Sequence, residues 1–176
     1  IELAEKIGGE IICADSRTIY KSMDIGTAKP GVPEQKNVVH YGLDLVEPNE
    51  RFTVYDWKKY AEQKIYEIRR LGKYPIIVGG TGLYIDALIY NYQFDQKHKS
   101  DQIDRNKMGD DFLVYGVKWT SEELRERIRL REQQMFDNEG LIAETKELVK
   151  KFDWNTQSMR SNIYQFVWRM LNKEIT

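Results

Sequence analysis

The 176-residue sequence has one cysteine and two histidines. The single cysteine, Cys13, excludes an internal disulfide, and its apolar neighbours favour a buried packing residue over a nucleophile. His98 lies in a strongly polar stretch and His40 in a predicted strand. We interpret His98 as a solvated loop residue and His40 as a structural residue, so neither is expected to bind a metal ion.

Long apolar runs and an excess of charge are also missing. No run approaches the ~20 apolar residues that a membrane span requires, and no signal-peptide pattern opens the chain, so a cytoplasmic location is expected. The net charge of -1 differs from the basic balance of many nucleic-acid-binding proteins, although arginines crowd residues 125–131. Fractions of 41% hydrophobic and 31% charged residues predict one globular domain over residues 1–176.

Short apolar runs alternate with amphipathic segments along the chain. The predicted strands span residues 10–13, 38–46, 74–78 and 112–117. The predicted helices span residues 1–7, 54–71, 83–90, 121–138, 141–152 and 158–171. This alternation predicts an α/β fold, a doubly wound sheet of about four parallel strands flanked by helices.

Two of these helices have explicit start signals. Thr53 precedes one helix and has Asp56 three residues later, and Thr120 and Glu123 stand in the same relation before another. Both pairs predict capping boxes, in which the hydroxyl and the carboxylate satisfy backbone amides reciprocally.

Polar groups gather in the loop after the first strand. Asp15, Ser16, Arg17 and Tyr20 place a carboxylate, a hydroxyl, a guanidinium and a phenol within six residues. In an open parallel sheet, the ends of the strands at this point face the ligand crevice. We therefore expect this loop to be functional.

A second candidate lies where the strand 74–78 meets the next helix. Gly79, Gly80 and Thr81 make this turn. Glycines let the backbone approach a ligand closely, and the free amides of a new helix favour an anion. The alternative is that these glycines only make a tight connection.

The third candidate is a pair of arginines. Arg127 and Arg131 are four residues apart in a predicted helix and should share one face, where two guanidinium groups suit a diphosphate. The alternative is pairing with acidic residues of the same helix, such as Glu123.

These candidates fall within blocks that resemble the signature of the tRNA dimethylallyltransferases, the IPP transferase family. The blocks are Asp15-Ser16-Arg17, Ile19-Tyr20-Lys21, Met23 to Pro30, Ile76 to Tyr84, and Arg127-Ile128 with Arg131 and Met135. Several blocks in the right order are far more specific than one glycine-rich match.

The resemblance implies a P-loop NTPase-like architecture with nucleotide (ATP) binding. No Gly-x-x-x-x-Gly-Lys-Ser/Thr motif occurs in the sequence. Residues 1–7 resemble the second half of the P-loop helix, so we expect the N-terminal strand and the P-loop to be missing by truncation, and this chain to be inactive by itself. Residues 92–110 are expected to form a short loop in place of the helical insertion that contacts the tRNA anticodon arm in the family.

The activity implied by the resemblance is transfer of a dimethylallyl group from dimethylallyl diphosphate to N6 of adenosine 37 in tRNA, with Mg²⁺ as cofactor. The tRNA anticodon loop is the expected partner, and a monomer is the expected state. Because the adenine amine is a poor nucleophile, a base that removes its proton helps the transfer, and Asp15 is the candidate. The family's contacts imply a tRNA-binding role for Asp15, Ser16, Arg17, Thr18 and Thr81.

The diphosphate leaving group requires positive charge and hydrogen-bond donors. Arg131 and Thr81 are the catalytic candidates for this task. Arg127, Gly79 and Gly80 are the candidates for binding the substrate. No residue is assigned to a metal.

Three other functions stay open. An adenylate isopentenyltransferase performs the same chemistry on a free adenine nucleotide, and the short 92–110 segment favours it. A small-molecule P-loop kinase would share the fold, and a non-catalytic RNA-binding remnant would explain the missing P-loop.

Overall fold

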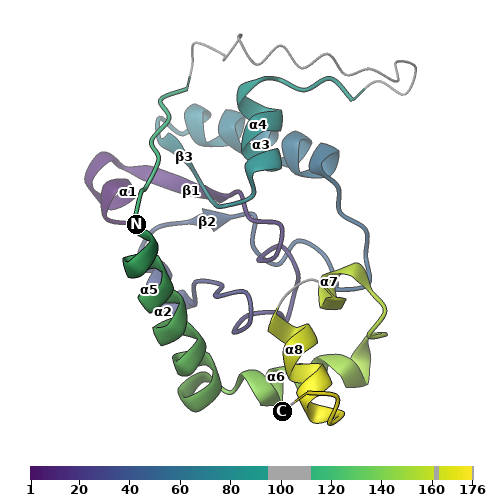
Figure 1. Cartoon of the computed structure of the whole chain (residues 1–176). Helices are drawn as coiled ribbons and strands as arrows, with labels where there is room; N and C mark the ends of the chain where they lie inside the picture. The colour runs from purple at the N-terminus through teal and green to yellow at the C-terminus, as the bar shows by residue number, and fades with distance from the viewer. Residues whose placement is uncertain (95–111, 161–162, 176) are drawn as a thin grey trace.

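The computed structural model describes residues 1–94, 112–160 and 163–175. Its centre is a parallel sheet formed by β1 (Gly9–Cys13), β2 (His40–Tyr41) and β3 (Tyr74–Val78), in the order β2-β1-β3 (Figure 1). Ile11 of β1 is paired with a residue on each side, His40 and Ile76. All five residues of β1 are buried, as expected for a central strand.

One face of the sheet is covered by α3 (Val54–Arg70) and α4 (Gly82–Ile89). Trp57 of α3 is fully buried and stacks on Tyr84 of α4, with ring centroids 4.6 Å apart. The Trp57 indole N–H also donates a hydrogen bond to the Cys13 carbonyl at 3.0 Å. This bond fixes α3 to the end of β1.

The opposite face is covered by α1 (Glu2–Ile7). Its Ala4 packs with Ile11, Cys13 and Val38. Burial, helped by the charge of Asp15, raises the pKa of the Cys13 thiol to about 11. The thiol therefore stays protonated at neutral pH, in agreement with the packing role that the sequence predicts.

The C-terminal helices form a second packed unit beside the sheet (Figure 1). They are α6 (Leu141–Lys151), α7 (Gln157–Arg160) and α8 (Ile163–Leu171). Their apolar side chains meet Ile19, Tyr20 and Met23 from the loop that follows β1. The loop therefore lies between the sheet and these helices.

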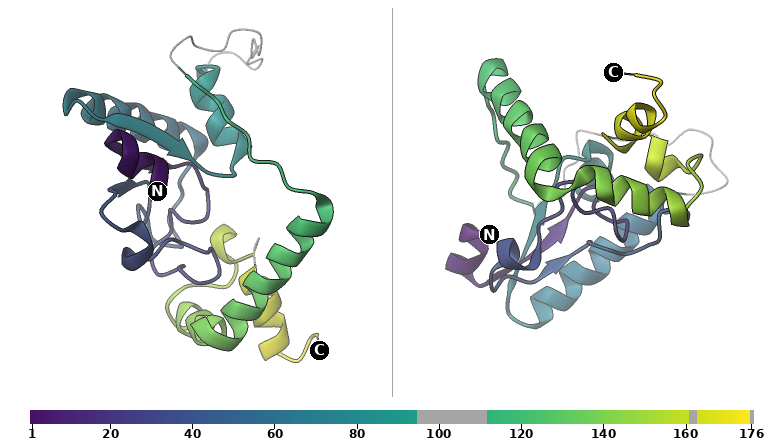
Figure 2. Two further views of the ribbon diagram at one scale, coloured as in Figure 1. Left: turned by 90° about the vertical axis from the view of Figure 1, so that its left-hand side faces the viewer. Right: turned by 90° about the horizontal axis from the view of Figure 1, so that it is seen from below.

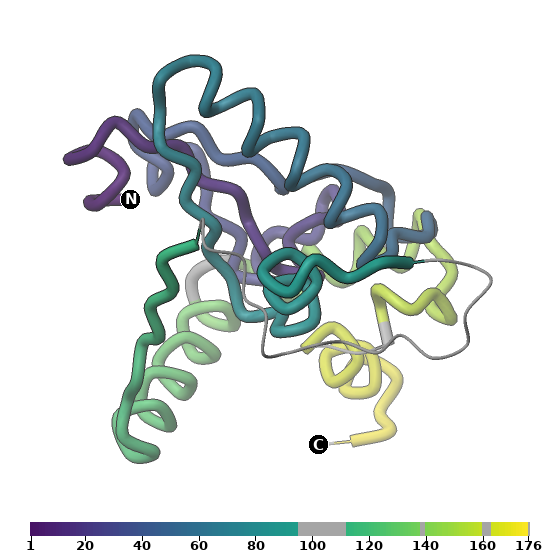
Figure 3. Tube along the Cα trace, turned by 90° about the horizontal axis from the view of Figure 1, so that it is seen from above, coloured from purple at the N-terminus to yellow at the C-terminus, as the bar shows by residue number. Residues whose placement is uncertain are grey.

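Three further helical elements are found in the described chain, and one of them contributes the buried Met135 to the core of the C-terminal helices. They are α2 (Val32–Gln35), α5 (Ser121–Gln134) and the π-helical turn η1 (Met135–Glu139). Figures 2 and 3 show α5 extending away from the body of the molecule, and α5 has no buried residue. Both predicted capping boxes, Thr53 with Asp56 and Thr120 with Glu123, are present.

The fold class is confirmed, but the prediction of a strand at 112–117 is wrong. Residues 112–120 have no regular secondary structure, and Leu113, Tyr115 and Val117 are 79%, 80% and 85% exposed. A β-strand requires a hydrogen-bonded neighbour, and this segment pairs with no strand among the described residues. The sheet accordingly has three strands in the described part of the chain rather than about four.

Two other predictions need new bounds. The predicted strand 38–46 is reduced to His40–Tyr41, because Gly42 and Asp44 have positive φ angles of 87° and 52° and turn the chain away. In the region of the predicted helix 158–171, the described residues form α7 up to Arg160 and α8 from Ile163, and residues 161–162 lie outside the described part of the chain. The predicted loop 92–110 lies outside the described residues from position 95 onward.

Candidate functional site

The candidate site begins where β1 ends, at the turn Asp15 to Thr18. The Asp15 carboxylate accepts a hydrogen bond from the backbone N–H of Arg17 at 2.7 Å, which closes the turn. Asp15, Ser16 and Arg17 are all partly exposed. One oxygen of Asp15 therefore holds the turn, and the side chain still reaches solvent.

Thr81 joins this turn to the start of α4. Its hydroxyl oxygen accepts a hydrogen bond from the Ser16 backbone N–H at 2.9 Å and donates one to the Ser16 hydroxyl at 3.2 Å. The backbone N–H of Thr81 donates to the Ala14 carbonyl at 3.1 Å. The structure thus brings together two candidate segments that are 65 residues apart in sequence.

The two glycines before Thr81 differ in their surroundings. A Cβ atom at Gly79 would lie 2.1 Å from the Ala14 carbonyl oxygen, so this position requires glycine for the close approach of β1 and β3. A Cβ atom at Gly80 would meet nothing within 4 Å, and Gly80 is exposed. Gly79 has a packing reason for its glycine, whereas Gly80 lies on open surface beside the site.

Two buried phenols line the inner side of this turn. Burial, together with the charges of Tyr20 and Asp15, raises the pKa of Tyr84 to about 12. Burial also raises the pKa of Tyr20, and the nearby Arg17 guanidinium partly offsets that rise. Both phenols are neutral at physiological pH, and the Asp15 and Asp56 carboxylates both act on Tyr84.

Thr18 is 6% exposed, and its hydroxyl has no hydrogen-bond partner among the described residues. Its backbone carbonyl accepts a hydrogen bond from the Asp44 N–H at 3.2 Å. The backbone of the turn is therefore fixed at its far end as well.

The candidate arginines lie on α5. The Arg127 guanidinium lies 4.4 Å from the centroid of the Trp119 ring, beside an open cavity of about 550 Å³. Arg131 is exposed, and its side chain makes no hydrogen bond or ion pair within the described residues. No described contact joins Arg131 to Asp15, so their convergence on one substrate stays a prediction. The alternative, in which Arg127 or Arg131 pairs with an acidic residue of the same helix, is not seen among the described residues, where Arg129 instead pairs with Glu126 at 2.7 Å.

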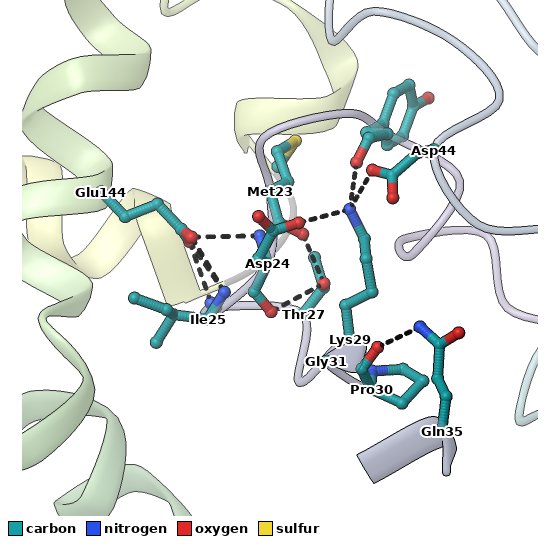
Figure 4. A network of polar contacts seen from close by, with 12 residues as sticks. Met23, Asp24, Ile25, Thr27, Lys29, Pro30, Gly31, Gln35, Asp44 and Glu144 are labelled. Carbon is teal, nitrogen blue, oxygen red and sulfur yellow. Dashed lines mark hydrogen bonds and ion pairs between the residues drawn. The ribbon is translucent and has the colours of Figure 1, made fainter. Parts of the chain in front are cut away.

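Sequence reasoning missed a set of residues that hold the far part of the loop. Lys29 is almost fully buried, and its ammonium group lies 2.6 Å from both the Asp24 and the Asp44 carboxylates (Figure 4). It also donates to the Tyr20 carbonyl at 2.7 Å. The position of Lys29 within the block of residues 23–30 was the sequence signal for this role. Glu144 also holds this loop, but it lies 115 residues further along the chain, and no sequence pattern pointed to it.

The described residues contain no group of three or more His, Cys, Asp or Glu side chains that could hold a metal ion. None of the described helices has the length and apolar character needed to cross a membrane.

A model of the IPP transferase family matches residues 18–110 and 95–176. The chain belongs to this family. A tRNA dimethylallyltransferase from Staphylococcus saprophyticus is 31% identical to it in an alignment that covers 100% of this chain and 75% of the relative. A second tRNA dimethylallyltransferase, from Staphylococcus haemolyticus, is 50% identical over 105 residues, which are 60% of this chain and 32% of that relative's length.

Solved structures of IPP transferases share the fold of the whole described chain. The tRNA isopentenylpyrophosphate transferase of Staphylococcus epidermidis has a TM-score of 0.87 and 30% identity, covering 99% of this chain and 76% of its own. The tRNA isopentenylpyrophosphate transferase of Bacillus halodurans has a TM-score of 0.88 and 28% identity, and the match covers 99% of this chain and 73% of the Bacillus chain. The predicted P-loop NTPase-like fold is thereby confirmed.

A more distant structure is that of a eukaryotic dimethylallyltransferase acting on tRNA. Its TM-score is 0.52 at 26% identity, and the match covers 97% of this chain but only 36% of the eukaryotic chain.

Proposed function

We propose that this protein transfers a dimethylallyl group to an adenine base of tRNA. The observation that carries the proposal is the pair of hydrogen bonds between Ser16 and Thr81. These bonds place the Asp15 turn beside the exposed start of α4, at the end of the sheet where ligands bind in open α/β folds. The names of the relatives, tRNA dimethylallyltransferases, support the same activity.

In this proposal Asp15 accepts the proton from the adenine N6 as the new carbon–nitrogen bond forms. The bond between the dimethylallyl carbon and the diphosphate oxygen breaks, and the electron pair leaves with diphosphate. Thr81, the amides after Gly80, Arg127 and Arg131 stabilise that anion. Asp15 to Thr18, with Thr81, contact the RNA after the base has left its stack.

We propose dimethylallyl diphosphate as the donor and adenosine 37 of the anticodon loop as the acceptor. We also propose that the protein acts as a monomer in the cytoplasm.

Mg²⁺ is the proposed cofactor, and the residues present fit it only through the substrate. The described chain offers one carboxylate, Asp15, and the hydroxyls of Ser16 and Thr81 at this point. Magnesium ions are commonly bound by one or two carboxylates together with substrate phosphates, and they neutralise phosphate charge. We therefore expect Mg²⁺ to bind with the donor diphosphate.

The test is the Asp15→Asn variant of the full-length protein. Labelled dimethylallyl diphosphate and undermodified tRNA are the substrates, and transfer of label is measured beside tRNA affinity. Because general-base catalysis contributes about 10²- to 10⁴-fold, we expect a loss of that size in the transfer rate with tRNA affinity nearly unchanged. An equal loss of binding would assign Asp15 a structural role.

A parallel incubation with AMP distinguishes the free-nucleotide alternative. Label on AMP, or inhibition of tRNA labelling by AMP at low concentration, would favour an adenylate isopentenyltransferase. Binding of tRNA without any transfer by the wild-type protein would favour a non-catalytic RNA-binding role.

A further inference from the structure

The side chain of Glu144 holds a turn far from it in sequence. Its carboxylate on α6 accepts hydrogen bonds from the backbone N–H groups of Asp24 at 3.1 Å, Ile25 at 2.9 Å and Gly26 at 3.1 Å (Figure 4). Consecutive amides that converge on one anion form a rigid arrangement, because each charge-assisted bond constrains the same short stretch of backbone.

Tyr164 of α8 completes this arrangement. It is fully buried, its hydroxyl donates to the Glu144 carboxylate, and the Gly26 N–H also donates to the Tyr164 oxygen at 3.1 Å. A Cβ atom at Gly26 would lie 2.5 Å from Tyr164 Cζ, so only glycine fits there. We call Glu144, Tyr164 and the amides of residues 24–26 the loop clamp.

The clamped turn is connected to the candidate site. Asp24 lies inside the clamp and pairs with Lys29, which pairs in turn with Asp44. The Asp44 backbone N–H donates to the carbonyl of Thr18, the last residue of the site turn. A continuous path of hydrogen bonds and ion pairs therefore runs from the C-terminal helices to the Asp15–Thr18 turn.

We propose that Glu144, together with Tyr164, is a positioning residue that holds the loop from Asp15 to Lys29 in the conformation that receives the tRNA. The inference rests on the proposed function and adds the role of the C-terminal helices to it. Met23 in the same loop is fully buried and packs in the core, but apolar contacts have little directional preference. Convergence of the amides on Glu144 instead fixes the direction of the turn, which is what a docking surface requires.

The test compares Glu144→Gln with Glu147→Gln in the full-length protein. Glutamine keeps the size of Glu144 but removes the charge and turns N–H donors toward the loop amides. Glu147 is a matched control, since it lies on the same helix, is exposed and, within the described part of the chain, has its ion pair with Lys150 at 2.6 Å on the surface. Steady-state kinetics are measured separately with tRNA and with dimethylallyl diphosphate as the varied substrate.

For Glu144→Gln we expect kcat/KM for tRNA to fall about 10- to 100-fold, the range expected when a docking surface moves by about 1 Å. The KM for the donor should stay within about twofold, as should every parameter of Glu147→Gln. Tyr164→Phe retains the Glu144 carboxylate, so kcat/KM for tRNA should again fall while the KM for the donor stays unchanged, with a smaller loss. This variant replaces Glu144→Gln in the test if Glu144→Gln does not fold. Equal losses for tRNA and donor, or a Glu144→Gln variant that behaves as Glu147→Gln does, would overturn the proposal.

A measurement without activity separates this inference from the proposed function. Hydrogen exchange at the amides of residues 24–26 should accelerate at least about tenfold in Glu144→Gln, the factor that one charge-assisted hydrogen bond represents. If the wild-type protein transfers no dimethylallyl group, the proposed function fails whatever the exchange shows. If exchange is unchanged while the wild type is active, the loop clamp alone is wrong.

Discussion

The loop from Asp15 to Lys29 and helix α5 both carry candidate site residues, yet they are held in opposite ways. The loop has little regular secondary structure and is fixed by Thr81 just before α4, Glu144 of α6 and Tyr164 of α8. Helix α5 is regular and begins with its own capping box, but none of its residues is buried. Regular secondary structure therefore does not by itself place a side chain in the molecule.

This difference decides how firmly each part of the site is positioned. Ser16 has two hydrogen bonds to Thr81, whereas the Arg127 side chain has a ring contact with Trp119. The Arg131 side chain has no hydrogen bond or ring contact in the described structure. The acceptor side of the proposed reaction is thus preorganised. The residues proposed to bind diphosphate, Arg127 and Arg131, are instead positioned by the placement of α5.

Among the substitutions that test this difference between the loop and α5, Arg131→Ala should have the largest effect. If α5 supplies the charge that stabilises diphosphate, kcat/KM for dimethylallyl diphosphate should fall about 100-fold, the usual cost of removing one donor to a developing anion. Affinity for tRNA should change little. Steady-state kinetics and tRNA binding by the same preparation measure both quantities.

Arg129→Ala is the matched control for that experiment. Arg129 lies on the same helix but is paired with Glu126, so its removal should change kcat/KM by less than about twofold. Equal losses in the two variants would mean that α5 provides only general positive charge and that Arg131 has no specific role.

A smaller effect is expected from Thr81→Val, which tests the hydrogen bonds between Thr81 and the Asp15–Thr18 turn. Valine keeps the shape of threonine but leaves the Ser16 N–H without its acceptor. We expect about 1 kcal/mol of lost stability and about a tenfold lower transfer rate, because an unsatisfied donor costs that much and the Asp15 turn loses its link to α4. Chemical denaturation and the transfer assay provide the two values.

Thr81→Ser keeps the hydroxyl and should restore most of both losses. A serine variant as impaired as the valine variant would show that the methyl group, rather than the hydroxyl, is what the site requires.

The smallest effects should appear at opposite ends of the pH scale. Burial, with the neighbouring Glu144 charge, raises the pKa of Tyr164 above its unfolded value of about 10. Its contribution to stability is therefore complete below about pH 10 and is lost as pH rises further. Hydrogen bonds from Thr120 lower the pKa of Glu123, so its contribution is complete above its unfolded pKa of about 4.3 and is lost as pH falls below it.

Thermal unfolding of the wild type, Tyr164→Phe and Glu123→Gln between pH 3 and 11 checks this prediction. The phenylalanine variant should lose less stability than the wild type on going above about pH 10, and the glutamine variant should lose less below about pH 4. Parallel curves for all three proteins would contradict the assigned causes.

Local signals in the sequence were reliable where one segment contains all the relevant groups. The capping boxes at Thr53 and Thr120 fixed two helix starts, and Gly8, in the left-handed conformation at φ 68°, ends α1. The prediction of a strand from the apolar run at 112–117 was wrong because a strand is not determined by one segment alone. A strand depends on a neighbour that lies elsewhere in the chain, and its own residues carry no information about whether that neighbour is present.

The sequence by itself determined the α/β class, most helix bounds and the family, because alternating apolar runs, caps and ordered motifs are properties of short segments. Only the tertiary structure decided that Thr81 meets Ser16 and that Glu144 gathers the amides of residues 24–26. These contacts join residues 65 and 118 to 120 positions apart. Such pairs follow from how the helices pack on the sheet, and no local pattern specifies that packing.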